Sequence, residues 1–139
     1  MRNATTIGLL FLVNLLLTNC STYNPLPEAL ADPENVTTLK IQNVRLDSLP
    51  KEIGTLTNLK TLYLFRNKQQ KIPDEIGNLS NLVLLNAAYC GTLVRIPETI
   101  QYCHKLDVLY VDETLILPFS IRKVNSRLRV VRLGKGAVR

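Results

Sequence analysis

The stretch LKTLYLFRNKQQKIPDEIGNLSN, residues 59–81, decides the fold. Leu62 and Leu64 are two residues apart, so on a short strand both side chains point to one face. Tyr63 and Phe65 then point to the opposite face. The stretch therefore begins with a strand that has one apolar face and one face able to meet solvent.

The second half of the stretch predicts a tight turn. Ile76 and Leu79 are three residues apart, as on one face of a single helical or 3₁₀ turn. Pro73 lies outside the strand, where its missing N–H does not interrupt a ladder. A strand, a bend and a short turn make one unit, and one such unit cannot bury its leucines alone.

Three further phrases repeat this unit. They are LPKEIGTLTNL, IPETIQYCHKL and LPFSIRKVNSRL, and they align with IPDEIGNLSNL on a Leu/Ile–Pro pair. The pairs stand at positions 49/50, 72/73, 96/97 and 117/118, in steps of 23, 24 and 21 residues. The units run over 36–58, 59–81, 82–105 and 106–127, with a partial unit from 128.

With this period and 26 leucines in 139 residues, the chain resembles the leucine-rich repeat family, particularly its bacterial and plant type with LPxxIGxLxNLxxLxL units. The resemblance implies an α/β fold, a right-handed solenoid with short parallel strands on the concave face. Short helical or 3₁₀ turns would form its convex face. The resemblance also implies a protein-interaction role.

The family's asparagine position is only partly kept. Asn67 occupies it in the second unit and Cys90 in the third, where a small polar group is an accepted substitute. Val44 and Thr114 stand there in the first and fourth units. The fourth unit is also two residues shorter between Thr114 and Leu117, so we expect local irregularity there.

Residues 1–19 are predicted to be a signal peptide. Arg2 is the only charge in the first 27 residues, and the apolar run over 7–17 is too short to span a bilayer. The run ends in Leu-Thr-Asn-Cys, which resembles the lipobox of bacterial lipoproteins, where cleavage leaves a lipid-modified N-terminal cysteine. This implies lipidation of Cys20 and an exported chain anchored to the bacterial envelope. Asn19 departs from the usual small residue, as in the relaxed lipoboxes of spirochaetes, and secretion without a lipid is the alternative.

Residues 20–35 are predicted to be a tether and an N-terminal cap, followed by the repeat domain over 36–139. Pro25, Pro27 and Pro33 stand among polar residues there, which favours extended, irregular chain.

The sequence assembles no active site. His104 is the only histidine and no CxxC motif exists, so we predict no metal, no cofactor and no catalytic residue. Asp112 and Glu113 are adjacent acids at a strand end, which are usually solvated. Cys90 and Cys103 are interpreted as small buried hydrophobes, with a disulfide between them left open.

The outward residues of the strands and of the bends that follow form the predicted concave face. They are Thr38, Lys40, Gln42, Asn43, Thr61, Tyr63, Phe65, Arg66, Leu84, Asn86, Ala88, Tyr89, Val108, Tyr110, Asp112, Glu113, Val130, Arg132 and Gly134. These positions hold four of the seven aromatics in residues 20–139, where about one would fall by chance. Strand propensity explains part of the excess, because aromatics suit pleated surfaces.

Our hypothesis is a non-enzymatic module that binds a protein partner, which would be a host protein if the source is a pathogen. Aromatic residues beside an arginine supply large contact area with polar handles. The predicted binding residues are Tyr63, Phe65, Arg66, Tyr89 and Tyr110. The alternative functions are a structural or self-associating envelope protein, since short solenoids can stack end to end, and a freely secreted module.

The C-terminal end is basic. Residues 122–139 contain seven Lys/Arg and no acid, whereas residues 20–121 contain nine basic and eleven acidic residues. Such an end can attract an anionic surface, or its arginines can shield the exposed edge of the last strand. Export and the lack of an interleaved aromatic and basic motif argue against nucleic acid.

Overall fold

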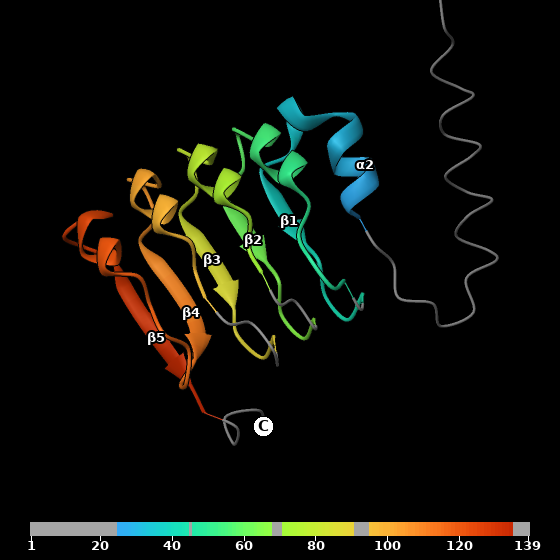
Figure 1. The fold of residues 1–139 in the computed structure, drawn as a ribbon. Helices are drawn as coiled ribbons and strands as arrows, with labels where there is room; N and C mark the ends of the chain where they lie inside the picture. Colours follow the sequence, from blue (N-terminus) through green and yellow to red (C-terminus); the bar gives the residue numbers. More distant parts are fainter. Residues whose placement is uncertain (1–24, 45, 68–70, 91–94, 135–139) are drawn as a thin grey trace, which may run out of the picture.

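The computed structural model describes residues 25–44, 46–67, 71–90 and 95–134. Within them, five short strands form one parallel sheet in chain order (Figure 1). The strands are β1 (Thr38–Lys40), β2 (Thr61–Tyr63), β3 (Leu84–Ala87), β4 (Val108–Asp112) and β5 (Arg129–Leu133). This sheet confirms the predicted leucine-rich repeat solenoid.

The sheet register follows the repeat. Leu39, Leu62, Leu85, Leu109 and Val130 are successive partners across the sheet, in steps of 23, 23, 24 and 21 residues. The four leucines at this level are buried. Each strand therefore adds one layer to a common core, which no single unit could close.

A 3₁₀ turn follows each Leu/Ile–Pro pair, as the sequence predicted. The turns are η2 (Lys51–Thr55), η3 (Asp74–Asn78), η4 (Glu98–Tyr102) and η5 (Phe119–Lys123), and they lie in a row along one side of the sheet (Figure 1). Ile53, Ile76 and Ile100 point from the first three turns into the core and are fully buried.

The N-terminal segment differs from the irregular chain expected there. Leu26–Ala31 form helix α2 and Pro33–Asn35 form a 3₁₀ turn, η1. Pro27 lies in the first helical turn, where its missing N–H costs no hydrogen bond. Leu26 and Ala29 are buried on the helix face that meets the core, and α2 lies beside β1 at this end of the sheet (Figure 1).

The last strand is one residue out of phase with our expectation. Val130 and Arg132 were predicted to face outward, but they pair in register with the buried Leu109 and Val111. Val130 is half-buried against the core, whereas the Arg132 side chain stays exposed at the end of the sheet. Two adjacent valines make the alternation of this strand ambiguous, and the hydrogen-bonded register decides it. Arg132 stands where earlier units have an apolar residue and donates to the carbonyls of the preceding bend, at 2.8 and 3.0 Å.

None of the helices in the described ranges is long and apolar enough to cross a membrane. The predicted signal peptide and Cys20 lie outside the described residues.

Candidate binding surface

The five predicted binding residues lie on the sheet face opposite the core or on the bend that follows it. Tyr63, Phe65, Tyr89 and Tyr110 are partly buried, and Arg66 is exposed. We call these five residues the concave patch.

Three members of the concave patch form a compact cluster. The Phe65 and Tyr89 rings meet edge to face, with centroids 5.2 Å apart and planes at 82°. This is the favoured geometry for an aromatic pair. The guanidinium carbon of Arg66 lies 5.0 Å from the Phe65 ring centroid, within the range of a cation–π contact. An apolar surface therefore lies directly beside a positive charge.

The backbone at this cluster has an unusual conformation. Asn43, Arg66 and Tyr89 occupy the same position in three successive units, and their φ angles are 56°, 58° and 54°. This left-handed region costs a residue with a side chain about 1 kcal/mol. Glu113, at the same position in the shorter fourth unit, does not share it. These three positions recur every 23 residues in the sequence, and this spacing could have indicated a shared backbone conformation. Our sequence analysis did not predict it.

Tyr89 is held at both ends. Its backbone N–H donates to Oδ1 of Asp112 at 2.7 Å, and its hydroxyl donates to the carbonyl oxygen of Gly134 at 3.3 Å. Asp112, which the sequence suggested was simply solvated, thus fixes the bend that carries the tyrosine. These two hydrogen bonds fix the position of the Tyr89 side chain and its backbone.

Tyr63 and Tyr110 lie in a second row of the same face. Both pair in register with Asn86, one from each side, so the rings flank that residue on adjacent strands. The Nζ atom of Lys40 lies 5.7 Å from the Tyr63 ring centroid. The structure therefore places Tyr63 and Tyr110 on the same face as the cluster.

Some predicted members of the face are placed elsewhere. Ala88 is fully buried, although it was expected to face outward. In β5 the register puts Arg129, Val131 and Leu133 level with the outward residues of β4, and sequence reasoning missed all three. The cause is the phase shift of β5.

Asn67 supports the bend below Arg66. Its side chain is buried, and its amide nitrogen donates to the carbonyl oxygens of Ile41 at 2.5 Å and Leu64 at 3.1 Å. Its oxygen accepts the Val44 N–H at 2.9 Å. In the next unit the Cys90 thiol donates to the Leu64 carbonyl oxygen at 3.0 Å, repeating the bond that Asn67 makes to Ile41. Cysteine thus serves as the predicted substitute.

The two described cysteines are free, buried thiols. Burial raises the pKa of Cys90 and of Cys103 to about 12, so both remain protonated near neutral pH. Within the described ranges, no group of three or more His, Cys, Asp or Glu side chains could hold a metal ion.

No family model matches the chain, and no curated protein matches it in sequence. Among solved structures, it is similar to a leucine-rich repeat protein of Leptospira interrogans, with 28% identity and a TM-score of 0.56. That match covers 81% of this chain and 35% of the other. It is also similar to the plant peptide hormone receptor RGFR1, solved in complex with RGF2, with 34% identity and a TM-score of 0.60.

The receptor match covers 69% of this chain and 16% of the receptor. The chain thus spans about a third of the length of the first relative and about a sixth of the second. Both relatives are leucine-rich repeat proteins. With the repeated sequence unit and the five-stranded parallel sheet, these similarities establish that the chain belongs to the leucine-rich repeat family.

Proposed function

We propose that this chain is a non-enzymatic module that binds a protein partner through the concave patch. The observation that carries the proposal is the cluster of Phe65, Tyr89 and Arg66, in which two rings and a guanidinium share one accessible surface. Aromatic and arginine side chains dominate the binding energy of protein interfaces. Their concentration on one face gives a partner a contact area with both apolar and cationic character.

The rigidity of the cluster supports binding rather than strand propensity alone. Propensity accounts for aromatics on strands, but Tyr89 lies on a bend in a conformation that disfavours side chains. Its two hydrogen bonds to the fourth and fifth units hold it there. A prepositioned side chain loses little freedom when a partner binds, and this raises affinity.

The similarity to the plant peptide hormone receptor RGFR1, whose structure was solved in complex with RGF2, supports a polypeptide as the partner. The outward side chains of successive strands offer an extended surface, which suits a polypeptide.

A photo-crosslinking amino acid at position 63 tests this surface in the source cells. We expect a discrete adduct with another protein, because this position borders the cluster. The matched control is position 102, where Tyr102 is 55% exposed on η4, away from the sheet face. Identical adducts from both positions would contradict the proposed surface, and an adduct with a second copy of the chain would favour the self-associating alternative.

We further propose that a lipid on Cys20 displays the module on a bacterial envelope. The support is the Leu-Thr-Asn-Cys motif after the apolar run, together with the similarity to a protein of Leptospira, a spirochaete. The mass of the N-terminal peptide from protein purified out of native membranes tests this. A diacylglyceryl-modified Cys20 is expected. A cleaved but unmodified N-terminus would contradict anchoring and leave a freely secreted module.

A further inference from the structure

Two large apolar side chains stand almost fully exposed on the segment between β4 and β5. Ile116 is 78% exposed and Phe119 is 77% exposed, more than any other large hydrophobic side chain in the described residues. Both line one hollow, together with Leu117 and Pro118. They are not part of the concave patch, and nothing in the described part of the chain covers them.

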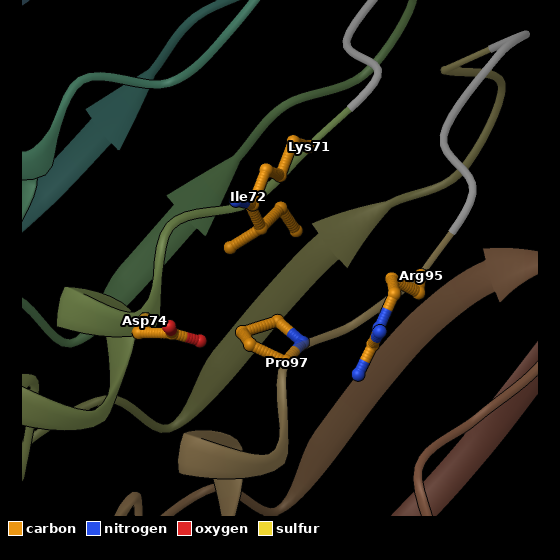
Figure 2. A pocket seen from close by; sticks show the side chains of 5 residues that line it. All are labelled: Lys71, Ile72, Asp74, Arg95 and Pro97. Atoms are coloured by element: carbon orange, nitrogen blue, oxygen red, sulfur yellow. The ribbon is translucent and has the colours of Figure 1, made fainter.

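The earlier units are polar at both positions. The residue two before the proline is Ser48, Lys71 or Arg95 in the first three units and Ile116 in the fourth, and the residue after the proline is Lys51, Asp74 or Glu98 and then Phe119. Figure 2 shows the corresponding hollow between the second and third units, with the charged Lys71, Asp74 and Arg95 along its lining. In the fourth unit, apolar residues thus replace the polar and charged ones on this flank. Because both side chains are exposed, they bury no additional apolar surface in the core.

Positive charge borders this apolar flank. The guanidinium carbon of Arg122 lies 6.0 Å from the Phe119 ring centroid, and Arg95 lines the same hollow. Glu98 is the one acid that lines it, and its Oε2 accepts a backbone N–H of η5 at 3.3 Å. The described residues that follow from 122 to 134 contain five Lys or Arg and no acid. The excess of positive charge therefore favours an anionic occupant of this flank.

We propose that this flank, formed by Ile116, Phe119, Arg95 and Arg122, contacts an anionic membrane surface. A second copy of the chain would bring two basic ends together, which is unfavourable. Two side chains of this size expose on the order of 300 Å², well below the 800 Å² or so that each partner buries in a stable protein interface. A bilayer needs no shape complementarity, because apolar side chains enter the acyl boundary while cations meet the lipid phosphates.

This membrane contact goes beyond the proposed function, because it uses a different surface and does not depend on Cys20. It would orient the module on an envelope and leave the concave patch free for a partner.

A local fluorescence measurement tests the membrane contact in the full chain. The chain has no tryptophan, so Phe119→Trp introduces a single reporter at the flank. The apolar run over 7–17 or an acyl chain can bring the protein to any vesicle, so the readout is local depth rather than binding. Vesicles of phosphatidylcholine and phosphatidylglycerol with brominated acyl chains should quench this reporter about twofold or more. The matched control, Tyr102→Trp, should keep its emission.

The dependence of this quenching on charge distinguishes a membrane contact from self-association. Arg122→Glu in the Phe119→Trp background should weaken the quenching, as should phosphatidylcholine alone or high salt. Equal quenching of the reporters at positions 119 and 102, or no quenching at 119, would overturn the proposal. A blue shift that grows with protein concentration in the absence of lipid would also overturn it, in favour of a second copy.

Discussion

Replacing Asn67 by alanine should lower the unfolding free energy of the solenoid far more than replacing a surface asparagine does. The Asn67 side chain satisfies the Val44 N–H and the carbonyl oxygens of Ile41 and Leu64. After truncation the Leu64 oxygen keeps the Cys90 thiol as a donor, whereas the first two groups lose the amide. A buried polar group left without its partner costs about 1–3 kcal/mol. We therefore expect Asn67→Ala to lower the unfolding free energy by about 2–5 kcal/mol, a large part of the total for a domain of this size.

Denaturant unfolding, followed by circular dichroism, measures this change. The control is Asn81→Ala, which removes two hydrogen bonds at the protein surface. The Asn81 amide donates to the Thr57 carbonyl oxygen at 3.0 Å, and its oxygen accepts from Nζ of Lys105 at 2.7 Å. Water can replace both partners, so this substitution should cost about 0.5–1 kcal/mol. The loss of unfolding free energy for Asn67→Cys should lie between those of Asn67→Ala and Asn81→Ala. Cys90 shows that a thiol can make one of the bonds that Asn67 makes. The reasoning is refuted if Asn67→Ala costs no more than Asn81→Ala.

Three further predictions concern the buried thiols and two glycines. At pH 8, alkylating reagents should leave Cys90 and Cys103 unmodified in the folded chain and label both once it is unfolded, because burial raises each pKa to about 12. In the unfolded chain the thiols ionise near their usual pKa of about 9, whereas in the folded chain they stay protonated to about pH 12. The unfolding free energy should therefore fall as the pH rises from about 9 to about 12. An unfolding free energy that stays constant over this pH range would contradict the prediction. Gly77→Ala should cost about 1–3 kcal/mol in thermal or denaturant unfolding, because the new Cβ would lie 2.8 Å from a backbone oxygen of the next unit. At Gly134 the nearest atom is a flexible carboxylate oxygen at 3.1 Å, so Gly134→Ala should cost about 0.5 kcal/mol or less, and equal costs at the two glycines would contradict the packing argument.

The repeated units made most of the fold predictable from sequence. Apolar residues two apart mark the strands, and those three apart mark the turns, because burial selects one face of each element. Leu62 and Ile76 are examples, since both are fully buried at the positions that the spacing predicted. Units that share the same apolar pattern stack with equivalent residues in register.

The same rule failed at the two ends of the array. At the N-terminus, prolines suggested irregular chain, yet Pro27 fits the first turn of α2 and Leu26 closes the core. At the C-terminus, Val130 and Val131 are both apolar, so only the hydrogen-bonded register shows which one faces inward. Terminal units lack a neighbour on one side, and the apolar pattern is therefore weakest there.

Alternation placed Tyr63, Phe65 and Tyr110 on the outward face, but it did not specify the bends that carry Arg66 and Tyr89. Tyr89 has a positive φ, and its N–H donates to Asp112, 23 residues later in the next unit. Such a contact depends on the exact stacking of neighbouring bends, which residue spacing alone does not specify.

The affinity of the double variant Tyr63→Ala/Phe65→Ala for the crosslinked partner tests the central claim most directly. Loss of two interface aromatics should weaken binding by about 30-fold or more, since truncating a dominant interface residue costs about 2 kcal/mol. If the double variant loses stability, Arg66→Glu provides a second test, because its side chain is exposed. This substitution should also weaken binding of the partner. The control Tyr102→Ala should bind as the unchanged protein does. Unaltered affinity in folded variants of the concave patch would contradict the proposal that this surface binds the partner.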